Sequence, residues 1–285
     1  MTGWIFILLS AFSSLLIAHF LKISENRGLD TVRVLTVNYF TASFSALLFA
    51  DKSGFSDAGT GVFPAFLLAI LVGIIFILNF FIYSKSVFLN GIGISVAMMR
   101  ISLIVPVLVS ILFFGEFLSY PQFAGVLLVF IILYLLIPGK KGLQNEPLKA
   151  GGYLLLLFVG TGIGDTSLKV FEIHFIHLVS KELFMGVVFL TAFCCGLTTL
   201  IWKRKLKFRK TELIIGVMIG IPNLLTSLFL ISALEMMNGA VVFSAVNLIT
   251  VAGGTVLGVL YWRDRFLSSQ WLGIFLAMIA ILLLL

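Results

Sequence analysis

Apolar residues fall in ten blocks along the chain, and short polar linkers separate them. Most blocks are about twenty residues long, the length at which an α-helix crosses the roughly 30 Å hydrocarbon core of a bilayer. The pattern predicts an all-α membrane protein with ten transmembrane helices. We expect the first block to be retained and not removed as a signal peptide, because no basic residue precedes it. The blocks cover residues 3–21, 34–50, 63–84, 91–113, 121–137, 151–170, 183–202, 213–234, 239–262 and 270–285.

Composition agrees with this pattern. Of the 285 residues, 61% are apolar and 11% are charged, and the mean hydropathy is +1.20. A soluble domain is about half apolar and about a quarter charged. The net charge of +7 lies mostly in short linkers, which favours membrane orientation signals over nucleic-acid binding. We therefore expect the lipid bilayer as a partner, and no nucleic acid.

The chain also repeats itself at an offset of 148 residues. An internal repeat of this length indicates a duplicated structural unit, and membrane transporters commonly contain two such units. We predict one five-helix repeat over residues 1–139 and a second over residues 149–285. Because five is odd, the second copy would enter the membrane from the opposite side. The matching pairs are Asn90 and Asn238, Gly91 and Gly239, Glu116 and Asp264, Gln122 and Gln270, and Gly125 and Gly273.

Basic residues are distributed unequally between alternate linkers. Odd-numbered linkers contain fifteen of them and even-numbered linkers contain two, Lys52 and Lys181. Cytoplasmic loops are enriched in Lys and Arg, so we expect the odd linkers in the cytoplasm and both termini outside. The richest is the seventh linker, which contains Lys203, Arg204, Lys205, Lys207, Arg209 and Lys210.

The segment 114–126, with Glu116, Gln122 and Gly125, and its second copy from Asp264 to Gly273 carry a resemblance. They resemble the turn between the fourth and fifth helices of an EamA-type unit of the drug/metabolite transporter (DMT) superfamily. The second copy departs from that pattern, since Arg263 and Arg265 flank Asp264. The resemblance implies two five-helix units around a central cavity lined by the first, third, fourth, sixth, eighth and ninth helices. It also implies efflux of amino acids or related metabolites.

Arg100 is the first candidate for substrate binding. It lies ten residues after Asn90, about 15 Å along a helix and thus near the bilayer midplane. An arginine there costs about 2.5–3.5 kcal/mol on insertion scales, so it must face protein or water. It could bind a substrate carboxylate or phosphate in a bidentate fork. Alternatively, it could pair with a helix end or a buried carboxylate.

Asp165 and Lys169 are the candidates for ion coupling. They lie four residues apart on the sixth predicted helix and share a face, so they could simply neutralise each other. Asp165 is also the one acidic residue clearly inside a predicted span, which makes it the candidate for coupling to a proton.

Three asparagines complete the set of predicted cavity residues: Asn79, Asn223 and Asn247. Asn247 lies one position from the repeat equivalent of Arg100, so the two could approach the same central space from opposite repeats. Each asparagine could instead link helices by hydrogen bonds. Pro222 and Pro106 each remove a backbone donor and should loosen their helices.

Other chemistry is poorly represented. Glu172, His174 and His177 have a spacing that a metal could use, but they lie in an interfacial linker, and we expect no metal or other cofactor. Neither HExxH nor GxSxG occurs, so an intramembrane enzyme is not favoured.

We expect a secondary transporter that works by alternating access on an amino acid or another carboxylate-bearing solute. Neutral sugars, nucleosides or drugs are the alternative substrates. We expect a monomer or homodimer in a bacterial cytoplasmic (inner) membrane.

Overall fold

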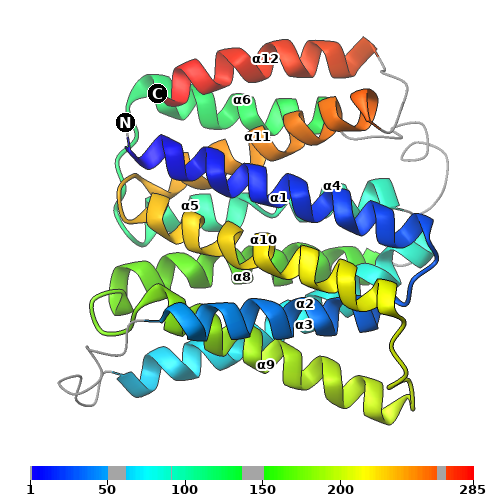
Figure 1. Cartoon of the computed structure of the whole chain (residues 1–285). Coiled ribbons are helices and arrows are strands. Elements are labelled where there is room, and N and C mark those ends of the chain that lie inside the picture. The colour runs from blue at the N-terminus through cyan, green and yellow to red at the C-terminus, as the bar shows by residue number, and fades with distance from the viewer. Residues whose placement is uncertain (1, 51–61, 91, 137–150, 262–267) are drawn as a thin grey trace. The chain divides into compact units, whose positions relative to one another are not determined.

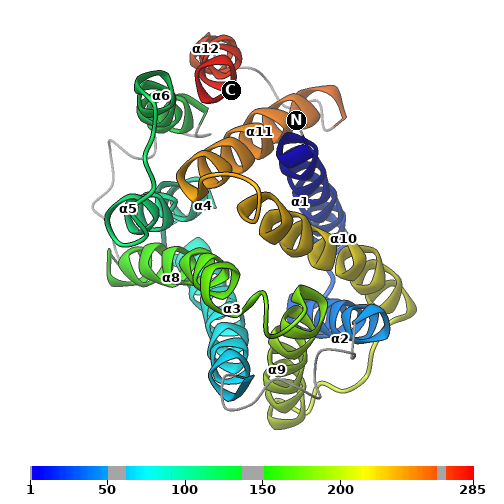
Figure 2. The same ribbon diagram turned by 90° about the vertical axis from the view of Figure 1, so that its left-hand side faces the viewer.

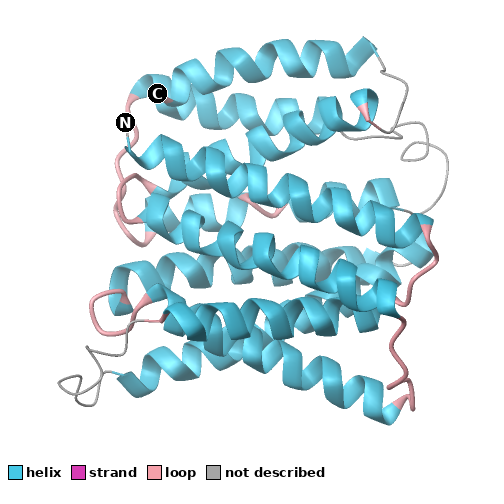
Figure 3. Cartoon of the chain, in the orientation of Figure 1, coloured by secondary structure: helices cyan, strands magenta, loops and turns pink. Residues whose placement is uncertain are grey.

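The computed structural model describes residues 2–50, 62–90, 92–136, 151–261 and 268–285 (Figure 1). This part of the chain consists of helices and loops, with no strand (Figure 3). The helices are α1 (Thr2–Asn26), α2 (Thr31–Phe49), α3 (Val62–Asn90), α4 (Ile92–Ile101), α5 (Ile104–Leu112), α6 (Tyr120–Leu136), α8 (Gly151–Phe175), α9 (Lys181–Trp202), α10 (Lys210–Leu234), α11 (Gly239–Leu260) and α12 (Ser268–Leu284).

The predicted all-α class is confirmed. In the described residues, eight spans are long and apolar enough to cross a membrane, with Ser95–Leu112 of α4 and α5 counted as one. The helices α6 and α12 have 17 residues each and fall short of the length required for this count. Crossing by these two helices stays a prediction. Eight spans of membrane length fit an integral membrane protein.

Many large apolar side chains lie on the exterior of the helices. Among them are Phe12, Phe44, Phe63 and Leu112, each more than half exposed. Soluble monomers rarely expose contiguous apolar surface of this kind, whereas a bilayer solvates it. The exposed apolar side chains therefore agree with the high apolar fraction of the sequence.

Among the helices that begin earlier than the apolar pattern predicts, α2 and α9 are capped by the side chain of the preceding polar residue. The Asp30 carboxylate accepts hydrogen bonds from the backbone N–H groups of Val32 and Arg33, and α2 starts at Thr31. Ser180 accepts from the N–H of Leu183, and α9 starts at Lys181. Such caps satisfy N–H donors that the first helical turn leaves free.

The predicted effect of proline is seen at one of the two positions. The span 91–113 is divided into α4 and α5 by Ser102 and Leu103, a few residues before Pro106. Pro106 cannot donate to the carbonyl of Ser102, which instead accepts from the N–H of Val105. By contrast, α10 continues past Pro222 without an interruption.

The chain divides into two compact units. Unit 1 comprises Met1–Leu8, Leu78–Lys169 and Met236–Leu285. Within it, α6 and α12 lie side by side (Figures 1 and 2), and Gly125 near the start of α6 touches Leu283 and Leu284 at the end of α12. These two helices therefore run antiparallel. The helix α11 packs on α5, α6 and α12.

Unit 2 comprises Leu9–Ile77 and Val170–Glu235, and α2 is its central helix. It packs against α9 and α10. Gly196 near the end of α9 lies on Thr36, and Gly186 near its start lies on Leu47, so α2 and α9 run antiparallel. Gly216 of α10 leaves space for Val37 of α2, which is the close packing that small residues allow in membrane helices.

Each compact unit contains helices from both predicted repeats, 1–139 and 149–285. A sequence repeat and a compact unit are thus different divisions of this chain, and the repeat boundaries stay a prediction. The helix bounds do recur at the predicted offset, since α6 and α12 are displaced by 148 residues at both ends. Asp264, the repeat equivalent of Glu116, lies outside the described residues.

Candidate functional site

Arg100 and Asn247 meet within unit 1. The guanidinium Nη1 of Arg100 donates a hydrogen bond to Oδ1 of Asn247 over 3.1 Å, from the last turn of α4 to the middle of α11. The amide of Asn247 donates in turn to the carbonyl of Phe243, also over 3.1 Å. This second bond fixes which side of the amide faces Arg100. Arg100 and Asn247 therefore contact each other directly, and a shared substrate cavity stays a prediction.

Asp165 adds the opposite charge. It lies on α8, and its carboxylate and the Arg100 guanidinium attract each other electrostatically. Both Arg100 and Asp165 are half-buried. The site thus presents a fixed cation, a carboxylate and an amide on three helices of one unit.

Asn79 lies next to the same face of α8. Its Nδ2 donates to Oγ1 of Thr161 over 2.8 Å, and Thr161 precedes Asp165 by one helical turn. Gly160 allows this approach, since a Cβ there would lie 2.8 Å from Oδ1 of Asn79. That oxygen is buried and has no hydrogen-bond partner among the described residues. Buried acceptors are rarely left unpaired, so it is available to a ligand donor or a water.

Lys169 forms an ion pair that the sequence did not predict. Its Nζ lies 3.0 Å from Oε1 of Glu116, and both side chains are largely buried. The other carboxylate oxygen of Glu116 accepts from the N–H of Ala240, in the first turn of α11. The aliphatic part of Lys169 lies against Gly239. Glu116 thus connects α8 to the positive end of the α11 dipole.

Asn223 belongs to unit 2, whereas the other predicted residues belong to unit 1. Its Nδ2 donates to Oδ1 of Asn38 over 3.1 Å, which links α10 to α2. Asn38 is buried.

Asn38, Thr161 and Glu116 were missed as candidates. A polar residue inside an apolar block was the available signal for Asn38, and membership in the repeated turn was the signal for Glu116.

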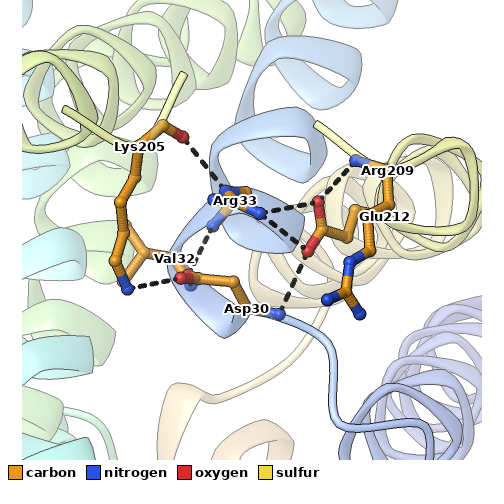
Figure 4. A network of polar contacts seen from close by, with 6 residues as sticks. All are labelled: Asp30, Val32, Arg33, Lys205, Arg209 and Glu212. Carbon is orange, nitrogen blue, oxygen red and sulfur yellow. Dashed lines mark hydrogen bonds and ion pairs between the residues drawn. The ribbon is translucent and has the colours of Figure 1, made fainter. Parts of the chain in front are cut away.

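A network of charges connects the first and seventh linkers within unit 2 (Figure 4). The Lys205 ammonium lies 2.9 Å from Oδ2 of Asp30, and Arg33 donates to the carbonyl of Lys205 and to both carboxylate oxygens of Glu212. Glu212 is buried and also accepts from the N–H of Arg209. These contacts place the two linkers at the same end of unit 2.

The charges around Asp30 change its pKa. Burial raises the pKa of this carboxyl group, but the hydrogen bond from Lys205, the backbone N–H of Arg33 and the charges of both residues outweigh burial. The pKa of Asp30 therefore lies below its usual value of 3.8. Asp30 is ionised at neutral pH and holds this end of α2 against the seventh linker.

Metal ligands are not gathered in the described part of the chain, where no three His, Cys, Asp or Glu side chains form a group that could hold an ion. Cys194 and Cys195 are free thiols on α9.

Comparisons with known proteins address the fold. No family model matches the sequence. A protein of Haemophilus influenzae that is described as uncharacterized is 29% identical over 284 residues, which covers 94% of this chain and 93% of that protein. A crystal structure with 16% sequence identity superposes with a TM-score of 0.75 and covers 99% of this chain and 96% of the other. The fold is therefore shared along the whole chain.

Proposed function

We propose that this protein is a secondary transporter that exports a small carboxylate-bearing metabolite, with an amino acid favoured, by alternating access. The observation that carries the proposal is the position of Arg100, which contacts Asn247 and is attracted by Asp165 inside a chain built of membrane-length helices. Ionisable residues inside membrane spans are costly and typically mark a substrate or ion path.

The donors of Arg100 suit a carboxylate. A guanidinium has five N–H donors in a planar fork, and the bond to Asn247 occupies one of them. Others can bind both oxygens of a carboxylate, which is the geometry that makes arginine a selective anion ligand. Asp165 supplies the complementary charge for a substrate ammonium group. A zwitterionic amino acid would satisfy both charges at once.

Antiparallel pairing of repeat-equivalent helices supports an inverted duplication. At the offset of 148, α2 corresponds to α9, α4 and α5 to α11, and α6 to α12. Each pair runs antiparallel: Gly186 lies on Leu47, Ser110 near the end of α5 lies on Gly239 at the start of α11, and Gly125 lies on Leu283. Inverted repeats of this kind underlie alternating access in several transporter folds. They also agree with the EamA-type resemblance of the turn around Glu116.

Contacts between linkers support the proposed orientation. The first and seventh linkers meet through Arg33 and the carbonyl of Lys205. At the other end of α10, Lys181 binds Glu235, and Asn238 donates to the carbonyl of Phe117, which brings even-numbered linkers together. This alternation is what the charge bias requires. We propose that odd linkers face the cytoplasm of a bacterial cell and that both termini lie outside.

Asp165 is the proposed coupling residue, and the proton is the proposed ion. Protonation would remove the charge that holds the ammonium group of an amino acid, so proton uptake by Asp165 would favour release of the substrate. Lys169 has a buried partner in Glu116. We propose that Lys169 sets the position of α8 against α11.

A flux screen tests the proposal. The purified protein is reconstituted in liposomes and assayed with labelled amino acids, carboxylic acids, nucleosides, sugars and cationic dyes. We expect counterflow of one or more solutes that bear a carboxylate. Lys85→Gln, which removes an exposed cation of α3, is the matched control for Arg100→Gln. Flux of a neutral sugar or a nucleoside that survives Arg100→Gln would assign Arg100 a structural role and overturn the carboxylate proposal.

A further inference from the structure

The turn between α9 and α10, together with the first residue of α10, presents basic side chains that no described carboxylate pairs. We define the basic turn as Lys203, Arg204, Lys207 and Lys210, all of which are exposed. Two neighbouring cations contribute to the network of Figure 4, Lys205 through its ammonium and Arg209 through its backbone N–H. Within the described residues, no carboxylate forms an ion pair with a member of the basic turn. Four positive charges therefore lie close together along the chain with no carboxylate partner in the described part of it.

Apolar side chains lie beside these charges. Trp202, the last residue of α9, is 83% exposed, and Leu206 within the turn is 50% exposed. Tryptophan at the end of a membrane helix is typical of the headgroup level, where its ring is half in hydrocarbon and half in water. The basic turn directly follows that level. In a bilayer, charges that follow this level would lie at the depth of lipid phosphates.

Arg204 occupies a backbone conformation that favours glycine. Its φ is +53°. Its N–H donates to the carbonyl of Ile201, and the N–H of Lys205 donates to the carbonyl of Leu200, which together form the Schellman motif that ends α9. The left-handed residue of this motif is usually glycine, because a Cβ there is strained. An arginine thus introduces strain at a position that glycine would fill without it. Strained residues of this kind are found at functional sites.

The turn is also held in place. The carbonyl of Lys205 accepts from Arg33, and its ammonium binds Asp30, so both ends of that residue are fixed to the start of α2 (Figure 4). A surface that is ordered before binding loses less conformational entropy when a ligand arrives. The four charges are therefore presented on a fixed support.

We propose that the basic turn is a docking surface for the headgroups of anionic phospholipids. Basic clusters next to a membrane helix attract anionic lipid, and each cation strengthens binding by about fivefold, the equivalent of about 1 kcal/mol. The indole of Trp202 would lie at the level of the lipid carbonyl groups while the cations contact the phosphates. This binding does not depend on the solute that the protein transports.

Lipid titration tests this surface directly. The full-length protein in neutral detergent is titrated with phosphatidylglycerol and, separately, with phosphatidylcholine, and bound lipids are counted by native mass spectrometry. Wild-type protein should retain phosphatidylglycerol preferentially, and added salt should weaken the preference. Replacement of all four cations by glutamine should weaken phosphatidylglycerol binding by at least about 50-fold. The double variant Arg27→Gln with Lys85→Gln removes exposed cations outside the basic turn. It should change phosphatidylglycerol binding by less than about threefold.

Arg204→Gly separates lipid binding from folding. This substitution removes one charge and relieves the strained backbone, so phosphatidylglycerol binding should fall by about fivefold while the melting temperature in neutral detergent does not decrease. Unchanged phosphatidylglycerol binding in the folded quadruple variant would overturn the proposal. So would displacement of the lipid by inorganic phosphate or by RNA at comparable charge concentration, since either would assign the basic turn to a soluble anion.

Discussion

The carboxylate of Glu116 joins two helices of unit 1 at once: Oε1 lies 3.0 Å from the ammonium of Lys169, and Oε2 accepts from the N–H of Ala240. Glu116 belongs to the repeated turn that precedes α6, Lys169 to α8, and Ala240 to the first turn of α11. A single turn residue therefore connects the helix that carries Asp165 to the helix that carries Asn247.

Glu116→Gln should destabilise the protein strongly. It leaves the buried ammonium of Lys169 without a counter-charge, and removal of one partner of a buried pair costs about 3–5 kcal/mol. The double variant Glu116→Gln with Lys169→Met removes the orphaned charge and should recover more than half of that loss. Thermal unfolding in detergent of the two single variants and the double variant measures the coupling. Additive losses would show that the pair contributes no interaction of its own.

Gly216→Ala should weaken the packing of α10 on α2. A Cβ at this position would lie 2.5 Å from Cβ of Val37 and 2.8 Å from the carbonyl oxygen of Val34, and the backbone atom cannot rotate away. We expect a loss of about 1–3 kcal/mol in the free energy of unfolding. Gly152→Ala is the matched control, because its Cβ would meet nothing within 4 Å. Equal melting temperatures for the two variants would contradict the close approach of these helices.

Asp30 should contribute stability that is lost in acid. Its pKa is lowered in the folded protein, so its contribution is present above the unfolded pKa of about 3.9 and disappears as the pH falls through the folded value. Asn still caps a helix, so Asp30→Asn should cost only about 1 kcal/mol at pH 7 and flatten the acid dependence. Melting temperatures between pH 7 and pH 3 measure this loss of stability for the wild type and for Asp30→Asn, with Glu25→Gln as the control. If Asp30→Asn left the acid dependence of the melting temperature unchanged, Asp30 would not be a source of that dependence.

The orientation can be measured with single cysteines. Lys207 lies in the seventh linker and Met236 in the eighth, and both are exposed. In a background with Cys194→Ala and Cys195→Ala, an impermeant maleimide should label Met236→Cys in intact cells and Lys207→Cys only after permeabilisation. The two positions serve as each other's control. Labelling in the opposite order would invert the topology while leaving the alternation of linkers intact.

The apolar pattern located the helices but not their ends. It placed a helix in every block that the structure describes, because a membrane-length apolar run leaves the backbone few alternatives to helix. The starts of α2 and α9 depended on Asp30 and Ser180, which lie outside the apolar runs. The interruption after Arg100 followed from Pro106, whereas Pro222 left α10 continuous. The effect of a proline on the continuity of a helix therefore depends on the neighbouring residues as well as on the missing backbone N–H donor.

Part of the site was predictable because two of its polar residues lie inside predicted spans and at nearly equivalent positions of the predicted repeat. Arg100 and Asn247 are polar residues within one position of equivalence at the predicted offset of 148, and the structure joins them at 3.1 Å. The partner of Lys169 was not predictable, because Glu116 is distant in sequence and reaches α8 only through the fold of its turn. Asn223 contacts Asn38, a residue within an apolar block that composition alone did not single out.

The most direct test of the central claim is the dependence of solute flux on the charge and shape of residue 100. For the carboxylate-bearing solute that gives the strongest counterflow, Arg100→Gln should lower uptake by about 10- to 100-fold, the equivalent of a lost charged hydrogen bond of about 1.5–3 kcal/mol. Arg100→Lys should retain part of it, since charge survives and the fork does not. Both variants must insert and melt as the wild type does. Wild-type uptake of every tested carboxylate by folded Arg100→Gln would contradict the account.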